Sequence, residues 1–408
     1  MNAVIARHSR GMRVLLLTIL LSNLTACTSG NQPVETLSTR VRPTNTSVPT
    51  SPDPTSTPAP LSLDYPLPTW SLGAIQAPVV FTIYGDYQSP PAAGLNVILA
   101  QLLALHPGEL KIEYRHFPLA TIHDKSLIAV LAAEAAGQQD HFWDMHAWLY
   151  QNQSLWSSDD PQAFVERLLD VAENMGLDRE IFRLAITDSQ LQSRVEATFS
   201  HAIRLDILSV PYIEINGEPF VLPSTLENLE AYYQLARVGT RQYDAYPPNR
   251  FDLEDTQIVS LVLDNGAEIT IQLFPESAPL AVNSFIFLAQ EGWYDGCGFY
   301  SVVPGIQVES GDPSHTGIGD PGYHFPTEID PVRSFDQAGM LAMITRGPDA
   351  NGSAFFITLT PRTELNGMRT IFGQVLEGLE QLESLPARSP LEDILEPLPL
   401  RITSITTH

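Results

Sequence analysis

Cysteine is almost absent from this chain. Cys27 and Cys297 are the two cysteines among its 408 residues, so a disulfide framework of the kind that staples small secreted domains is excluded. Basic residues are also scarce, because 22 Lys and Arg stand against 47 Asp and Glu and the formal net charge is -25. Nucleic acid needs a basic surface to neutralise its phosphates, so we exclude it as a partner. We interpret the acidity as an aid to solubility.

The first 26 residues have the layout of a secretory signal peptide. Arg7, Arg10 and Arg13 precede the apolar run VLLLTILLSNL, which is short for a membrane span. The next residues, Leu-Thr-Ala-Cys, resemble a bacterial lipobox, which implies that Cys27 becomes the lipidated first residue of the mature protein. The resemblance therefore predicts an extracytoplasmic lipoprotein, anchored to the membrane at Cys27, with Cys297 as its remaining free thiol. The alternative is an ordinary signal peptide in which Cys27 has no role.

Composition divides the rest of the chain. Residues 27–65 are rich in Pro, Thr and Ser and are predicted to form a disordered tether, because they cannot bury a core. Residues 66–236 have the texture of a folded α/β unit. Residues 237–256, with YPPNRFDLED, are predicted to be a linker. Residues 257–408 are mostly short strands and Gly-rich loops, which is typical of a β-barrel.

Residues 66–236 are predicted to be an α/β domain with an inserted helical subdomain. VVFTIYG, LKIEYRHF and PYIEING are expected strands, the last ending in a turn at Asn216-Gly217. A block of amphipathic helices separates the second strand from the third, and its first helix is closed by Gly137. The final helix is expected to start with a capping box formed by Ser224 and Glu227.

Four segments of this domain follow one another in the order FTIYGDYQSPPA, YRHFPL, AAEAAGQQDHFWDMHAWLYQNQ and ILSVPYIEING. In these segments and their order the domain resembles the DsbA-like members of the thioredoxin superfamily. The family has Cys-Pro-x-Cys where this chain has Ser89-Pro90-Pro91-Ala92, so both sulfurs are absent. A serine hydroxyl is hardly ionised at neutral pH, and we predict no disulfide exchange here. Pro211 matches the family's cis proline, beside which peptide backbone docks, so peptide binding stays open. His116, His123 and His141 lack metal-ligand spacing, and no metal or cofactor is predicted.

Residues 257–408 begin with an expected hairpin around Asn265-Gly266. They then contain, in order, APLAVNSFIFLAQEGWYDG, FYSVVPGIQVESGDP, GMLAMITRGPDANGSAFFITL and IFGQVLEGLE. Through these segments they resemble cyclophilins, the peptidyl-prolyl cis-trans isomerases, over nearly their full length. The resemblance implies a closed β-barrel with an apolar pocket for the proline ring, formed here by Ile306, Phe356 and Leu365.

The family's polar catalytic set is depleted in this chain. Ser301 stands at the position of the family's arginine, Ala354 at that of a glutamine, and Glu309 at that of another glutamine. Arg369 stands at the family's histidine position and is the candidate substitute donor. Each preorganised donor contributes about a hundred- to thousand-fold in rate, so catalysis is predicted to be weakened.

Two functions follow from these patterns. The first is a membrane-anchored, extracytoplasmic cyclophilin-type isomerase that assists folding by acting on X-Pro bonds of polypeptides. The second is a catalytically inactive, chaperone-like module in which both domains bind peptide without turnover.

Overall fold

The computed structural model describes residues 67–249 and 258–408. The predicted signal peptide, lipidated Cys27 and tether lie outside these ranges, and so does part of the predicted linker. Within the described ranges, no helix combines the length and the apolar character that a membrane crossing requires.

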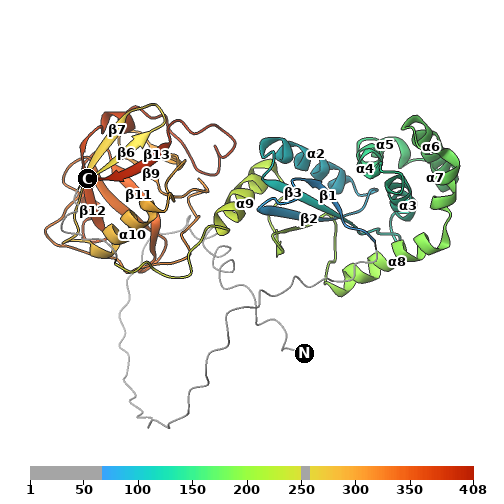
Figure 1. Cartoon of the computed structure of the whole chain (residues 1–408), viewed down its shortest axis with the longest axis horizontal. Helices are drawn as coiled ribbons and strands as arrows, with labels where there is room; N and C mark the ends of the chain where they lie inside the picture. Colours follow the sequence, from blue (N-terminus) through green and yellow to red (C-terminus); the bar gives the residue numbers. More distant parts are fainter. Residues whose placement is uncertain (1–66, 250–257) are drawn as a thin grey trace, which may run out of the picture. The chain divides into compact units, whose positions relative to one another are not determined.

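The N-terminal domain contains a five-stranded sheet in the order β1-β3-β2-β4-β5. Figure 1 labels its strands β1, β2 and β3. The strands are β1 Trp70–Gly73, β2 Val79–Gly85, β3 Leu110–His116, β4 Tyr212–Ile215 and β5 Glu218–Pro219. Central strands β2 and β3 are parallel, whereas β4 is antiparallel to β2 and β1 is antiparallel to β3. Helix α2, Pro90–Leu105, connects the parallel pair, as a parallel connection requires a crossover.

Helices fill the sequence between β3 and β4. Their order is α3 Ser126–Gly137, α4 Phe142–Gln151, α5 Gln153–Trp156, α6 Pro161–Asn174, α7 Arg179–Ile186 and α8 Ser189–Arg204. Three of them start with an aspartate whose carboxylate accepts backbone N–H bonds, namely Asp160, Asp178 and Asp188. Such caps satisfy orphan donors of the first turn. The chain then returns through β4 to α9, Leu226–Gly239.

Local signals of this domain are confirmed with one exception. Asn216 and Gly217 have φ values of 50° and 83° and join β4 to β5 as a tight turn. Helix α3 ends at Gly137. The prediction of a capping box formed by Ser224 and Glu227 is wrong. The N-cap of α9 is Thr225, whose hydroxyl accepts the Asn228 N–H at 3.3 Å. The extended backbone at Thr225 aims its own side chain at the first turn.

The C-terminal domain is built on an eight-stranded antiparallel sheet in the order β13-β6-β7-β12-β10-β11-β9-β8. Most of these strands are labelled in Figure 1. Its strands are β6 Ile258–Leu263, β7 Glu268–Leu273, β8 Ser301–Val303, β9 Gln307–Ser310, β10 Met340–Thr345, β11 Asn351–Thr358, β12 Ile371–Glu377 and β13 Ile402–Thr407. The predicted hairpin around Asn265-Gly266 joins β6 to β7. Helix α10, Pro279–Gln290, packs on the sheet.

The expected closed barrel is found only as a curled sheet. Its outer strands β8 and β13 are not paired with each other in the described strand order. Backbone hydrogen bonds link the segment before β8 to the start of β13 instead, with Gly296 N–H donating to Ile402 O and Ile402 N–H to Cys297 O, both at 2.8 Å. Strand β8 is only three residues long. The irregular segment before it therefore makes the hydrogen bonds to β13.

Candidate active site

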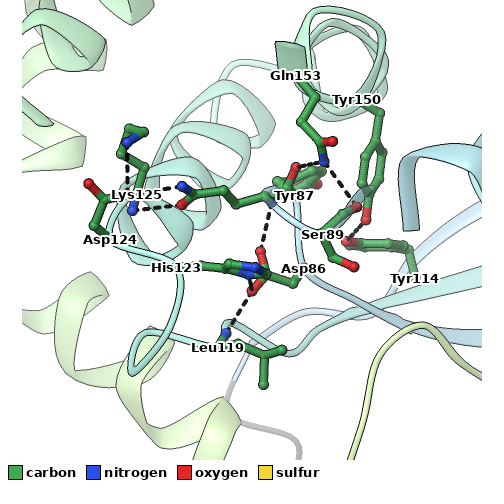
Figure 2. Close-up of polar contacts among 11 residues, drawn as sticks. Asp86, Tyr87, Ser89, Tyr114, Leu119, His123, Asp124, Lys125, Tyr150 and Gln153 are labelled. Carbon is green, nitrogen blue, oxygen red and sulfur yellow. Dashed lines mark hydrogen bonds and ion pairs between the residues drawn. The ribbon is translucent and has the colours of Figure 1, made fainter. Parts of the chain in front are cut away.

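The start of α2 is the first candidate site, and Asp86 is its centre. The Asp86 side chain is fully buried, and its carboxylate accepts the N–H groups of Gln88 and Leu119, both at 2.7 Å (Figure 2). His123 Nδ1 lies 2.9 Å from the same carboxylate. These contacts tie the β2–α2 corner to the segment after β3. The two other histidines that the sequence analysis considered also pair with carboxylates. His116 pairs with Glu134, and His141 pairs with Asp144.

A second layer of polar contacts holds the corner from its outer side. The Gln88 amide donates to Asp124 at 2.9 Å and accepts the Lys125 N–H at 2.8 Å. Figure 2 shows Gln153 on the other side of the corner, where its amide donates to Tyr87 O and Ser89 O. The backbone at this corner is therefore fixed by side chains from several elements.

The chemistry that the corner can perform is limited by Ser89. This residue is the N-cap of α2 and Pro90 is the first helical residue, as expected. Its side chain forms no capping hydrogen bond, and within the described residues its hydroxyl has no hydrogen-bonded base. Ser89 and Ala92 are both 4% exposed. The corner keeps a rigid helix start but has neither thiol nor activated hydroxyl. The Val210-Pro211 peptide is cis, as the resemblance implies, and Pro211 is half-buried.

The second candidate site is a row of side chains across the C-terminal sheet. Ser301 on β8 pairs with Glu309 on β9, and Glu309 pairs in turn with Phe356 on β11. Phe356 pairs with Ala342 on β10, which pairs with Ile371 on β12. Directly paired residues point to the same face of a sheet. The row therefore has a polar end at Ser301 and Glu309 and an apolar end from Phe356 onward.

The apolar end is a separate hydrophobic cluster, distinct from the main core. On β10 and β11 alternate residues divide between the two, since Leu341 and Phe355 belong to the main core whereas Ala342 and Phe356 belong to the cluster. Phe356 stacks on Phe335 with ring centroids 5.8 Å apart. The other members are Phe274, Met340 and Ile371, with Ile344 and Leu365 packed against them.

Glu309 dominates the electrostatics of the polar end. Burial raises the pKa of its carboxyl, and hydrogen bonds from Gln307 and Ser301 together with the charge of Arg346 oppose that rise. The Gln307 amide donates to Glu309 at 2.8 Å and accepts from Arg362 at 2.7 Å. The Arg362 guanidinium also pairs with Glu364. The donors of Gln307 and Arg362 are thus present, but their hydrogen bonds go to neighbouring side chains.

The remaining predicted site residues are not all brought together. Leu365 contacts the cluster. Ile306 lies in the turn between β8 and β9, is 40% exposed and is not a member of the cluster. Ala354 is buried on β11, two residues before Phe356 and so on the same face. Half-buried Arg369 precedes β12 and forms no hydrogen bond or ion pair with other described residues.

Sequence reasoning missed several members of this site. Phe335, Ala342 and Ile371 line the cluster, and Gln307 with Arg362 forms the polar bridge at its rim. The continuous apolar run MLAMI in β10 could have indicated a strand with two apolar faces. Gln307 and Arg362 are 55 residues apart, and no local signal predicts their contact.

The C-terminal part thus combines a curled antiparallel sheet with an apolar cluster beside a polar rim. A family model described as "Cyclophilin type peptidyl-prolyl cis-trans isomerase/CLD" matches residues 258–407. The chain belongs to this family. A second model, described as "Thioredoxin", matches residues 67–234, and the N-terminal domain is thioredoxin-like.

Two bacterial relatives agree with this membership, and one solved structure is also similar in sequence. Peptidyl-prolyl cis-trans isomerase B of Bacillus subtilis is 39% identical over 133 residues, which cover 33% of this chain and 93% of that protein. The isomerase B of Streptomyces anulatus is 36% identical over 163 residues, covering 34% and 93%. A Cryptosporidium parvum cyclophilin type isomerase, crystallised in the presence of the dipeptide Ala-Pro, is 32% identical with a TM-score of 0.34, covering 37% of this chain and 99% of that one. The chain is thus a cyclophilin-type peptidyl-prolyl isomerase joined to a thioredoxin-like domain.

Proposed function

We propose that the C-terminal domain isomerises X-Pro bonds of polypeptides with a catalytic rate well below that of cyclophilins with the full polar set. The observation that carries this proposal is the row from Ser301 to Ile371. Phe356 offers the proline ring an apolar contact, which requires only shape. Ser301 and Glu309 lie beside it, where the prolyl amide would be held. That amide must lose planarity against a barrier of about 18–20 kcal/mol.

The weakness follows from the polar end of the row. A serine side chain is too short to replace an arginine fork that hydrogen-bonds the twisting amide. At neutral pH an ionised carboxylate accepts hydrogen bonds and donates none. Ala354 supplies no polar group. The free Arg369 is the remaining candidate donor, because it has no competing partner among described residues.

Two-dimensional exchange NMR on a short Ala-Pro peptide tests this proposal. We expect measurable peptide binding, with cis-trans exchange faster than in the free peptide but slower than with the Bacillus subtilis isomerase. Arg369→Ala should lower the exchange rate further, whereas Met368→Ala at its exposed neighbour serves as control. A wild-type rate equal to that of the bacterial isomerase, abolished by Arg369→Ala, contradicts weakened catalysis.

We further propose that the protein works outside the cytoplasm, held to the membrane by a lipid on Cys27, and assists the folding of secreted chains. The support is the Leu-Thr-Ala-Cys sequence after a short apolar run. Replacement of Cys27 by Ala should move the protein from the membrane fraction to the soluble or unprocessed fraction. A processed Cys27→Ala protein that still sediments with membranes contradicts the anchor.

A further inference from the structure

A cavity of about 170 Å³ lies inside the N-terminal domain, and Ala92 of the β2–α2 corner is one of its lining residues. The cavity is enclosed by α2, α4 and the sheet strands β1, β2 and β3. The buried aliphatic part of its wall consists of Ile83, Ala92, Leu95, Leu99 and Ile112. A cavity of about 150 Å³ with a similar aliphatic wall holds one benzene molecule. The size therefore corresponds to a single aromatic ring.

Aromatic side chains form one side of the cavity. Tyr114, Trp143, His146 and Tyr150 all line it. The His146 ring meets Tyr114 at 4.6 Å and 82° and Tyr150 at 5.1 Å and 82°, both edge-to-face. The hydroxyls of Tyr114 and Tyr150 form a hydrogen bond of 2.7 Å, which is drawn in Figure 2. A planar ring placed among them would extend this edge-to-face arrangement.

The lining carries no ionised group. Its members include no Asp, Glu, Lys or Arg. His146 is neutral, since burial lowers its pKa to about 3. Asn96 Oδ1 can only accept, so His146 Nε2 donates to it at 3.0 Å and Nδ1 accepts from the Tyr87 hydroxyl at 3.0 Å. A charged ligand would lose its hydration here without gaining a counter-charge.

Two side-chain amides at the cavity have no acceptor for their N–H groups among the described residues, namely those of Asn96 and of the exposed Gln151. The Asn96 amide oxygen is occupied by His146, but its amide nitrogen forms no hydrogen bond with other described residues. The residue is half-buried and belongs to the lining. The mouth lies where lining residues are exposed, at Leu72 of β1 and at Ala100 of α2. A ligand could therefore enter between these elements.

We propose that this cavity is a binding site for a neutral, single-ring aromatic molecule that carries one hydrogen-bond acceptor. The ring occupies the aliphatic and aromatic wall, and the acceptor meets the Asn96 amide nitrogen. The thioredoxin-like domain is then a small-molecule binding module, although its helix corner lacks the redox sulfurs. This inference does not depend on the isomerase activity of the other domain.

Ligand-observed NMR titration of the full-length protein with three matched probes tests the proposal. Benzyl alcohol is neutral, whereas benzoate and benzylammonium have the same ring with opposite charges. We expect saturable binding of benzyl alcohol and affinities at least about tenfold lower for both ions. Equal binding of all three, or tighter binding of benzylammonium, overturns the proposal.

A pair of substitutions on the same helix locates the binding. Ala100→Leu places a larger side chain at the mouth and should weaken benzyl alcohol binding by about tenfold. Ala104→Leu makes the same change one turn further along α2, at an exposed residue outside the lining, and should leave the affinity unchanged. Equal affinities of the two variants would place the probe elsewhere. Circular dichroism and thermal melts verify that both variants fold.

Discussion

The β2–α2 corner of the thioredoxin-like domain and the pocket of the cyclophilin domain have each kept a scaffold and lost polar chemistry, but with different consequences. At the corner the chemistry depends on sulfur atoms, and Ser89 with Ala92 leaves none. At the pocket, part of the catalytic effect comes from apolar shape around Phe356, which survives. We therefore expect a site built on reactive sulfur atoms to lose its activity completely, and a site built on binding and orientation to keep part of it.

Restoring the polar end of the pocket is expected to have the largest effect. The double variant Ser301→Arg and Ala354→Gln adds donors beside Phe356, and each such donor is worth about 2.7–4 kcal/mol in the transition state. Exchange NMR on the Ala-Pro peptide should show a rate increase of about a hundred-fold or more. The dissociation constant should change much less, because these groups act mainly on the twisted amide.

Restoring the corner is the matching experiment in the other domain. Ser89→Cys with Ala92→Cys places two thiols at the N-terminus of α2, where the helix dipole favours a thiolate. The variant should reduce insulin, and the wild-type protein should stay at background. Ser89→Ala should be indistinguishable from wild type. Turnover in the wild-type protein that disappears in Ser89→Ala contradicts a redox-silent corner.

Removing the apolar floor tests whether shape alone sustains the pocket. Phe356→Ala deletes a buried ring that stacks on Phe335. We expect the free energy of unfolding of the domain to fall by about 3–5 kcal/mol. Peptide binding should be lost under conditions where the variant is still folded. Chemical denaturation and peptide titration measure the two effects. Unchanged peptide affinity would show that the proline ring binds elsewhere.

We expect Glu309 to make the isomerase activity depend on pH. Burial raises the pKa of this carboxyl, so it takes up a proton at a higher pH than an exposed glutamate does. Below that pKa the carboxylic acid can donate a hydrogen bond, and above it the carboxylate cannot. The isomerisation rate should therefore rise several-fold as pH falls through the raised pKa.

The variant Glu309→Gln serves as the reference for this pH profile. Its neutral amide donates at every pH, so its rate should be flat and at least equal to that of wild type at neutral pH. The folded wild-type protein binds this proton more readily than the unfolded chain, so its stability should also gain slightly as pH falls towards the ordinary glutamate pKa. A flat wild-type profile contradicts the assignment.

The smallest effect is expected at Cys297, the buried free cysteine of the cyclophilin domain. Its side chain is fully buried, and burial raises the pKa of the thiol, so it is an unreactive apolar residue. Cys297→Ser should leave peptide affinity within a few-fold of wild type. A much larger loss of affinity, measured by the same titration, would indicate a role for the thiol.

Short-range signals in the sequence determined much of the fold. The Asn216-Gly217 and Asn265-Gly266 turns, the strands VVFTIYG and LKIEYRHF, and the proline after Ser89 act through backbone preferences of neighbouring residues. They could be predicted because their physical cause lies within a few residues. The capping box at Ser224 was wrong for a related reason, since two adjacent hydroxyl residues compete for one cap and the backbone of Thr225 decides between them.

The arrangement of the site residues was decided by the tertiary structure alone, because it depends on contacts between residues far apart in the chain. The order of motifs in the sequence indicated the two domain families and named Phe356 and Leu365 as pocket residues. It could not show that Ser301, Glu309 and Phe356 form one row, because strand register is set by pairing across the sheet. The bridge from Arg362 to Gln307 and the uncharged cavity around His146 depend on burial among side chains far apart in the chain. Burial and register arise only on folding, and they determine which polar groups can act.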